Sequence, residues 1–392
     1  MSDALPQIPA GEYPQRWRRV QQMMEAEQLD LLIAYADDRA VFGPAHARWL
    51  ANFPVHFEPV CVVLACSGEP LLLCGPESDQ YALLSSRIRD VYILREFTHP
   101  DEDYPFSLIR SLAEVAAMLV SGSNSLRRVG VAGRGLIGYD FYVALQEALP
   151  GVEWLDVETA MCSLRARKSE AEQAVMRYAY SIAEAGIAAA VAAIAPGVTE
   201  REIAAAAEAA MRHAGAEGTG IDTIVASGPH ARPILGRSTF RRIEENDLVL
   251  LTVAPRYEGY HAAIGRPVLV GSPDPQAEKA LEVAVQAQIA CRAALRPGVE
   301  GRAVEAVGRR IVEEAGLGQY FLYSGVHSVG VIEFEPPIFG PSSSAAIEQG
   351  MVISIDIPIF NAPWGGLRIE DGYLITDTGA EHLHDTPFAI RC

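Results

Sequence analysis

The sequence lacks any continuous apolar run of about 18 residues, the length that a membrane-spanning helix needs. Positive charge is also scarce, because 32 Lys and Arg residues stand against 50 Asp and Glu residues and give a net charge of −18. Nucleic acids and anionic membranes are bound through basic surfaces, so we expect neither as a partner. The N-terminal sequence MSDALPQIPAGEYPQRW lacks the charged and then apolar pattern of a signal peptide, which predicts a cytoplasmic protein.

The six cysteines include no CxxC pair, so the spacing typical of a zinc or redox site is missing. Several of them stand in apolar runs, which favours inert core thiols. What the chain does have is length and apolar content. Its 392 residues, 49% of them hydrophobic, are enough for two domains with cores of their own.

The first part of the chain alternates between helical and strand patterns. An amphipathic helix is predicted over 12–30, and the apolar run LDLLIAYA follows it. Alternating strands and helices predict an α/β domain. Ser169 and Glu172 have the spacing of a capping box and open a long Ala-rich helix. We therefore place an N-terminal domain at 1–160 and a second domain at 161–392.

The second domain contains an internal repeat. Each half reads as helices followed by strands, which predicts an α+β domain with a pseudo-two-fold axis and a site on the seam between the halves. The matching segments are 194–203 with 295–304, 246–255 with 350–358, and 259–271 with 365–376.

The stretch 323–371 concentrates ionisable groups among apolar residues. The runs 352–355 and 373–376 predict strands, and the ionisable set is His327, Glu333, Glu335, Asp356, Glu370 and Asp371. Burying an unpaired carboxylate is expensive, so Asp356 and Glu370 are the first candidates for a functional site. A buried ion pair with Arg368 is the alternative interpretation of the same pattern.

Seven motifs follow one another in an order and spacing that resembles the pita-bread fold family, which includes methionine aminopeptidase, aminopeptidase P, prolidase and creatinase. The motifs are RARKSEAE, VASGP, NDLVLLTV, GYHAAIGRP, VHSVGVIEFEPP, GMVISIDIP and LRIED. The resemblance covers nearly the whole chain. It implies a creatinase-like α/β N-terminal domain, a pita-bread C-terminal catalytic domain and a homodimer.

Metallopeptidases of this family hold two divalent metals with two Asp, one His and two Glu. In this chain those positions fall on Thr252, Ala263, His327, Asp356 and Glu370. Thr and Ala cannot replace bridging carboxylates, so the resemblance predicts that a dinuclear site is missing. The family's two helper histidines are also absent, since their positions fall on Leu235 and Phe334.

Creatinase works without metal, and the resemblance places its catalytic histidine on His230 in SGPHARP. A creatinase active-site aromatic falls on His261. One of the carboxylates that grip creatine falls on Gly265, and the arginine anchors are unmatched, so creatine itself is not expected. We therefore predict a metal-independent, creatinase-like hydrolase that cleaves a C–N bond of a small-molecule substrate and needs no cofactor.

In this hypothesis His230 activates water or protonates the leaving nitrogen, and His327 donates to an oxygen. Asp356 and Glu370 hold a cationic or NH-rich part of the substrate, and Glu335 is a further acid–base group, with capping of a turn as its alternative. Substrate-binding roles are predicted for five residues: His261, Thr252, Phe57, Phe334 and Arg368.

Two alternatives remain open. One is a mononuclear metal-dependent hydrolase, peptidase or lyase of the Xaa-Pro peptidase family, with the metal on His327, Asp356, Glu370 and His261. The other is a non-catalytic module that binds peptides.

Overall fold

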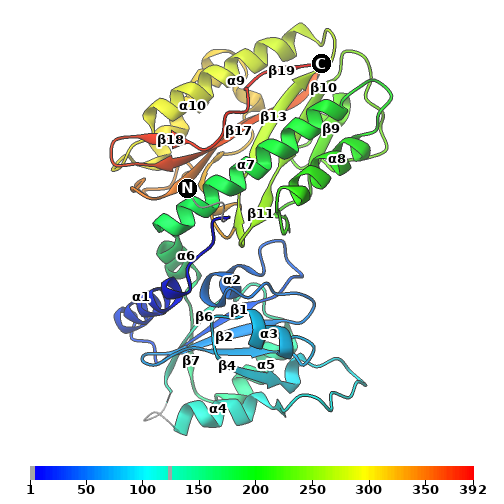
Figure 1. Ribbon diagram of the computed structural model, residues 1–392. Coiled ribbons are helices and arrows are strands. Elements are labelled where there is room, and N and C mark those ends of the chain that lie inside the picture. Colours follow the sequence, from blue (N-terminus) through cyan, green and yellow to red (C-terminus); the bar gives the residue numbers. More distant parts are fainter. Residues whose placement is uncertain (1–4, 122–125) are drawn as a thin grey trace. The chain divides into compact units, whose positions relative to one another are not determined.

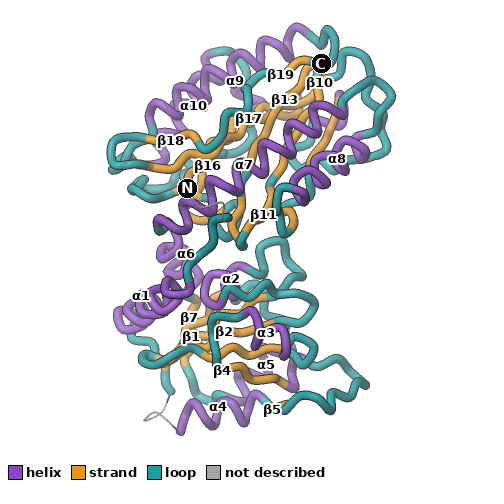
Figure 2. Tube along the Cα trace, viewed as in Figure 1, coloured by secondary structure: helices purple, strands orange, loops and turns teal. Residues whose placement is uncertain are grey.

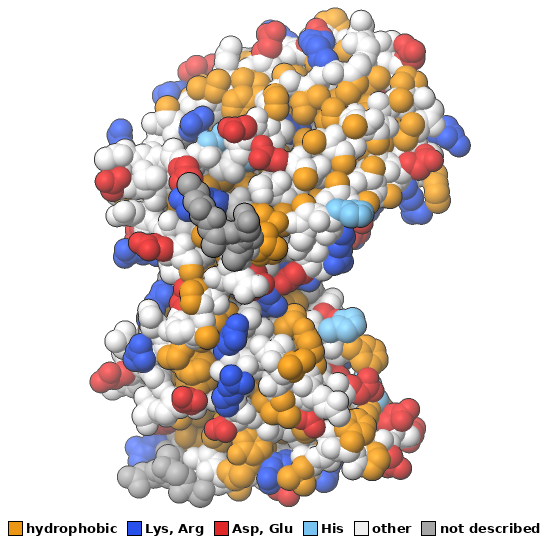
Figure 3. Space-filling model, viewed as in Figure 1, with side chains coloured by type: hydrophobic (Ala, Val, Ile, Leu, Met, Phe, Trp, Pro, Cys, Tyr) orange, Lys and Arg blue, Asp and Glu red, His pale blue; other side chains and the backbone are white. Residues whose placement is uncertain are grey.

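The computed structural model describes residues 5–121 and 126–392. It divides into two units, Pro9–Leu164 and Arg165–Cys392, and the N-terminal segment up to Ile8 belongs with the second. None of the described helices combines the length and the apolar character that crossing a membrane requires. On the face drawn in Figure 3, acidic and basic side chains are interspersed among apolar ones.

The N-terminal unit is a seven-stranded mixed sheet with helices, as the alternating pattern predicted (Figure 1). The strand order is β5-β4-β3-β2-β1-β6-β7, and β2 pairs antiparallel with both β1 and β3. The strands are β1 Leu31–Ala36, β2 Val60–Ala65, β3 Leu71–Cys74, β4 Asp90–Leu94, β5 Ile109–Arg110, β6 Arg128–Ala132 and β7 Glu153–Asp156. The helices are α1 Tyr13–Ala26, α2 Ala45–Ala51, α3 Asp79–Ser85, α4 Leu112–Ser121, α5 Tyr139–Ala148 and α6 Glu158–Ala166.

The C-terminal unit repeats one arrangement twice, a pair of helices followed by strands. The first half has α7 Glu170–Ala193, α8 Glu200–His213, β8 Gly218–Thr219, β9 Ile224–Ser227, β10 Leu248–Val253, β11 Pro255–Tyr257, β12 Tyr260–His261 and β13 Ile264–Leu269. The second has α9 Pro275–Ala294, α10 Gly301–Glu314, β14 Val326–Ser328, β15 Glu335–Ile338, β16 Val352–Ala362, β17 Gly365–Ile375, β18 Ala380–His382 and β19 Ile390–Arg391. The predicted pseudo-two-fold α+β domain is confirmed.

Helix α7 begins where the capping box predicted. The Ser169 side chain accepts a hydrogen bond from the backbone N–H of Glu172, and the Glu172 side chain accepts one from the backbone N–H of Ser169. Thr199 and Glu202 do the same for α8. Helices α7 and α9, drawn purple in Figure 2, pack on strands of the central sheet, α7 on β10 and β13 and α9 on β16 and β17.

The strand register places four positions opposite one another across the sheet, whose order is β15-β14-β16-β17-β13-β10-β9. Asp356 of β16 faces Glu370 of β17, Glu370 faces Gly265 of β13, and Gly265 faces Thr252 of β10. Residues directly opposite on paired strands point to the same face. We call Asp356, Glu370, Gly265 and Thr252 the cross-strand row.

The other face of β16 and β17 is apolar. Ile355, Ile357 and Ile369 are fully buried in a core cluster that includes Ala284 and Cys291 of α9. Hairpin β16–β17 is longer than the runs from which its strands were predicted, because its antiparallel pairing continues from Val352 to the turn before Gly365.

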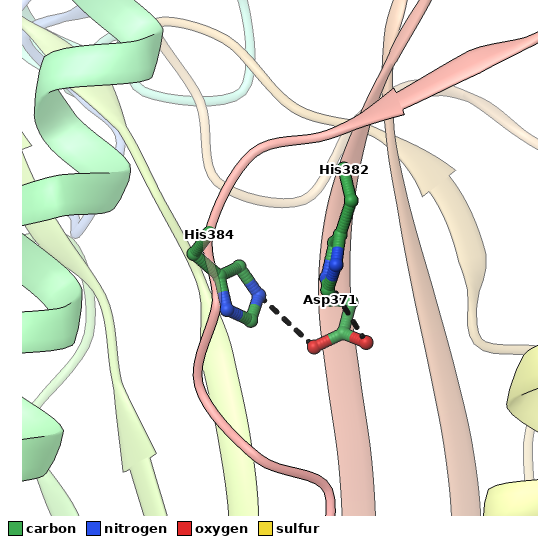
Figure 4. A group of neighbouring side chains, drawn as sticks. All are labelled: Asp371, His382 and His384. Atoms are coloured by element: carbon green, nitrogen blue, oxygen red, sulfur yellow. Dashed lines mark ion pairs between the residues drawn. The ribbon is translucent and has the colours of Figure 1, made fainter.

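Asp371 follows Glu370 and therefore points to this opposite face. The Arg266 guanidinium donates to it, Tyr373 Oη donates to its Oδ2 over 3.1 Å, and Gln288 Nε2 donates over 3.2 Å. Nε2 of His384 lies 3.0 Å from Oδ1, and Nε2 of His382 lies 3.4 Å from Oδ2 (Figure 4). These contacts make Asp371 a structural anchor between the sheet, α9 and the C-terminal segment.

Burial alone would raise the pKa of Asp371, but the Arg266 charge and the nearby His382 and His384 rings hold it well below its ordinary value. The ionised Asp371 carboxylate therefore adds to the free energy of unfolding at pH values above about 4, the pKa of Asp in the unfolded chain. This contribution is lost as the pH falls towards the lower pKa of Asp371 in the folded protein.

We expect Asp371→Asn to lower the free energy of unfolding by about 3 kcal/mol at neutral pH, because it leaves Arg266 buried without its counter-charge. Urea unfolding at several pH values measures this loss, which should shrink in strong acid. Glu381→Gln is the control: it breaks the exposed pair with Arg177 and should cost less than about 1 kcal/mol. Equal losses in the two variants would contradict the anchor role.

Candidate functional site

A compact group of metal-ligating side chains lies on the face of the sheet that carries the cross-strand row. Donor atoms of His327, Glu333 and Glu370 lie within 4.8 Å of one another, and all three residues are buried. Strand β14 carries His327, the segment just before β15 carries Glu333, and β17 carries Glu370. The Phe334 ring packs at 4.3 Å, centroid to centroid, against the His327 imidazole. One imidazole and two carboxylates form a ligand set suited to Zn²⁺, Mn²⁺ or Fe²⁺.

Arg368 brings a positive charge into the same site. Its Nε lies 3.2 Å from Asp356 Oδ2, and its Nη1 lies 3.9 Å from Glu370 Oε2. Tyr323 also donates its hydroxyl proton to Asp356, and Ser354 Oγ donates to Glu370 over 3.1 Å. The predicted buried pair of Asp356 with Arg368 is therefore present, but it is only one part of a larger charged group.

Burial dominates the protonation of these groups. It raises the pKa of Glu333 to about 7, against the lowering effect of Arg368. Burial, with the charges of Asp356 and Glu333, raises the pKa of Glu370 well above its ordinary value. Burial also lowers the pKa of His327 to about 4, so the imidazole is neutral near pH 7 and keeps a lone pair for a metal. Glu333 and Glu370 therefore hold a proton more readily than ordinary carboxyl groups, and a bound cation would favour their ionised forms.

The two positions at which the family resemblance expects Asp ligands contribute no charge. Thr252 is 1% exposed, and its Oγ1 has no hydrogen-bond partner among the described residues. Ala263 is fully buried and has no donor atom. The residues present therefore fit one divalent ion on His327, Glu333 and Glu370, and they do not fit the family's complete ligand set for two.

His261 lies outside this ligand group. Its ring packs where a Cβ on Gly220 would stand, and its Nδ1 lies 3.2 Å from the carbonyl oxygen of Gly330. Burial lowers the pKa of His261 to about 3. The sequence predicted a single-metal site on His327, Asp356, Glu370 and His261. The structure instead groups His327 and Glu370 with Glu333. Glu333 had been noted as an ionisable residue of this stretch, but its turn has no periodicity to show which way it points.

Glu335 has a partner that the sequence did not reveal. Its Oε1 accepts a hydrogen bond from Arg165 Nε over 2.9 Å, and both side chains are almost completely buried. This ion pair ties β15 to the beginning of the C-terminal unit. It indicates a structural role, in place of both the acid–base role and the turn cap considered from the sequence.

His230 lies at the surface and not among the buried ligands. It belongs to the short 3-10 helix Gly228–Ala231, and its side chain is 45% exposed. Its Nδ1 lies 3.4 Å from Oε2 of Glu200, which also accepts hydrogen bonds from Thr239. The imidazole is thus oriented by a buried carboxylate while its other nitrogen remains available.

Phe57 belongs to the N-terminal unit, where its side chain is 57% exposed. Its φ of 66° is unusual for a residue with a side chain. The ligand group described above is built entirely from the C-terminal unit, so the substrate-binding role expected for Phe57 remains a prediction.

A second group, Asp371, His382 and His384, also has metal-ligating atoms within 4.8 Å of one another. Its carboxylate, however, already receives hydrogen bonds from Arg266, Gln288 and Tyr373. This group is accounted for as the structural anchor described above.

Comparison with known proteins shows which families the two units match. The model of metallopeptidase family M24 matches residues 174–377, and that of the creatinase/prolidase N-terminal domain matches residues 16–167. An Xaa-Pro dipeptidase of Pyrococcus horikoshii is 30% identical over 315 residues, which are 80% of this chain and 88% of that protein. One from Pyrococcus furiosus is 33% identical over 252 residues, which are 64% of this chain and 72% of that protein.

A solved structure shows the same fold. The prolidase from Pyrococcus horikoshii superposes with a TM-score of 0.82 at 25% identity, covering 95% of this chain and 99% of the other. The chain belongs to metallopeptidase family M24. The predicted fold class is thereby confirmed, and so is a hydrolase acting on a C–N bond, the kind of bond that a dipeptidase cleaves.

Two predictions were wrong. The family match, the Xaa-Pro dipeptidase relatives and the group of His327, Glu333 and Glu370 overturn the expectation of an enzyme without a cofactor. The same findings contradict a metal-independent, creatinase-like hydrolase as the main function and favour the metallopeptidase alternative. The carboxylates missing at Thr252 and Ala263 are partly replaced by Glu333, which stands outside the family's ligand positions.

We expect Glu335→Gln to destabilise the protein by about 3 kcal/mol, because Arg165 loses its buried counter-charge. Folded protein should keep its turnover number, since the ion pair lies outside the ligand group. Thermal unfolding together with kcat of the folded fraction measures both effects. A variant of unchanged stability that has lost kcat would restore the acid–base role.

Proposed function

We propose that this chain is a metal-dependent peptidase that acts on Xaa-Pro dipeptides or similarly short peptides. The observation that carries the proposal is the buried group of His327, Glu333 and Glu370, whose donor atoms lie within 4.8 Å of one another. The substrate class is taken from relatives that are named Xaa-Pro dipeptidase and share 30–33% of aligned residues with this chain.

His327, Glu333 and Glu370 would hold a divalent ion, which when bound would supply Lewis-acid chemistry for a peptide carbonyl or a water molecule. The surrounding residues set the protonation and the orientation of the ligand side chains. His327 is neutral at neutral pH and offers a lone pair. Ser354 orients the Glu370 carboxylate by donating to Oε1, and Tyr323 and Arg368 hold Asp356 beside it.

The apolar surroundings on this side suit a small, uncharged ring such as that of proline. Phe360 belongs to a buried cluster with Leu250 and Ala231, and Tyr323 packs against this cluster. The rings of Tyr323 and Phe360 stack with centroids 6.3 Å apart. Apolar residues with a few placed polar groups are typical of small-molecule sites.

His230 is the candidate for moving a proton between the site and solvent. Its helix packs on the start of β17, where a Cβ on Gly365 would lie 3.1 Å from the carbonyl oxygen of Gly228. Glu200 fixes the ring through Nδ1, which leaves Nε2 to exchange a proton with water or with a leaving amine. The homodimer and the cytoplasmic location expected from the sequence remain predictions.

Removal of metal should abolish activity. Hydrolysis of a panel of Xaa-Pro dipeptides, before and after dialysis against a chelator and again after adding Mn²⁺, Co²⁺ or Zn²⁺, measures this. His327→Ala and Glu370→Gln should lose activity and bound metal together, because each removes a ligand. The matched control is His213→Ala, which changes an exposed histidine of α8.

Full activity after complete metal removal would contradict the proposal. A folded protein that binds peptides and metal but never hydrolyses them would instead support the binding-module alternative.

We expect His230→Ala to lower kcat by about 100-fold with little change in KM or in bound metal, as is typical for loss of a general acid–base group. Steady-state kinetics with metal analysis checks this, and an unchanged kcat would remove His230 from the mechanism.

A further inference from the structure

Three buried carboxyl groups gather around one buried guanidinium in this site. When ionised, Glu333, Asp356 and Glu370 carry three negative charges, and they lie in a buried region with Arg368 as the charged partner. One guanidinium leaves an excess of two negative charges. A single divalent ion neutralises that excess, whereas the four carboxylates of the family's dinuclear site match two such ions.

Gly265 makes the room that Arg368 occupies. A Cβ added to Gly265 would stand 2.8 Å from Arg368 Cδ and 2.9 Å from Cγ, well inside van der Waals contact. Gly265 lies between Thr252 and Glu370 in the cross-strand row. The aliphatic part of Arg368 therefore lies over Gly265, the neighbour of Thr252 in the cross-strand row.

Two aromatic rings and one carboxylate hold the guanidinium. Its central carbon lies 5.7 Å from the ring centroid of Tyr323 and 5.5 Å from that of Phe360, distances typical of cation–π contacts. Its Nε lies against Asp356 Oδ2. The other carboxylate oxygen, Oδ1, is buried and has no hydrogen-bond partner among the described residues.

We propose that Arg368 takes the place of a second cation in this site, so that the chain binds one divalent ion, on His327, Glu333 and Glu370. This inference rests on the proposed metal-dependent function and adds its stoichiometry. The positions of Thr252 and Ala263 then need no carboxylate, because there is no second divalent ion whose charge a carboxylate would neutralise.

An ordinary structural ion pair would look different. The Arg266–Asp371 pair on the opposite face satisfies its carboxylate with several further donors. In the site, Asp356 Oδ1 has no donor among the described residues, and Glu370 Oε2 lies 3.9 Å from Nη1 of the same arginine. One more cation beside Arg368 would balance the charge of these carboxylates when they are ionised.

Titration of the purified, metal-depleted protein with Mn²⁺ tests the inference, using calorimetry for affinity and elemental analysis for the number of ions per chain. Wild type should bind one ion. Arg368→Met should bind Mn²⁺ at least about tenfold more tightly, because a positive charge near the ion is removed. Its melting temperature should also rise more on adding Mn²⁺ than that of wild type.

Two matched controls separate charge from structure. Arg368→Lys keeps the charge and should bind Mn²⁺ as wild type does. The double variant Arg368→Met with Asp356→Asn restores the net charge, and its affinity should return to that of wild type. If Arg368→Met does not fold, Asp356→Asn alone decides, since leaving Arg368 in excess should weaken binding at least about tenfold.

The outcomes are distinguishable. Two ions per wild-type chain, or an Arg368→Met affinity that is unchanged or weaker, would overturn the inference and leave the proposed metal-dependent function intact. No bound ion in wild type would overturn both.

Discussion

The C-terminal unit depends on how negative charge is kept inside a hydrophobic sheet. Glu333, Asp356 and Glu370 are buried together, and a carboxylate without a counter-charge is costly in such surroundings. Arg368 meets part of that cost, and the divalent ion that we propose on the group with His327 would meet the rest. Without a cation, burial raises the pKa of Glu333 and Glu370 and favours their neutral forms. Metal binding would displace those protons, which couples metal binding to pH and to stability.

The strand register determines which of these charged side chains lie together on one face of the sheet. Neighbouring residues of β17 serve opposite purposes: Glu370 points to the ligand group, and Asp371 points to the face packed on α9, where Arg266 neutralises it. Two glycines leave the space that larger neighbouring side chains occupy. Gly265 admits Arg368, and Gly220 admits the His261 ring. In this way the same family fold can lose two ligands and still hold a charged, organised centre.

The sequence predicted those features that follow from local or repeated patterns. The capping box of α7, the α/β N-terminal domain and the duplicated α+β domain are of this kind, and so are the positions of His327, Asp356 and Glu370 in one site. The side-chain contacts were not predictable, because neighbours far along the chain decide them. Glu335 pairs with Arg165, 170 positions earlier, and Glu200 fixes His230 from another helix. Glu333 lies in a turn, where no helical or strand periodicity predicts the direction of a side chain. Its position beside His327 and Glu370 is part of the evidence for a metal site.

The central claim is that one metal ion and one arginine share the work that two metal ions do elsewhere in the family. Anomalous diffraction from crystals grown with Mn²⁺ tests it most directly. The account predicts a single strong peak coordinated by His327, Glu333 and Glu370, with the Arg368 guanidinium still beside Asp356. Two peaks of comparable height on the face that carries the cross-strand row would contradict it.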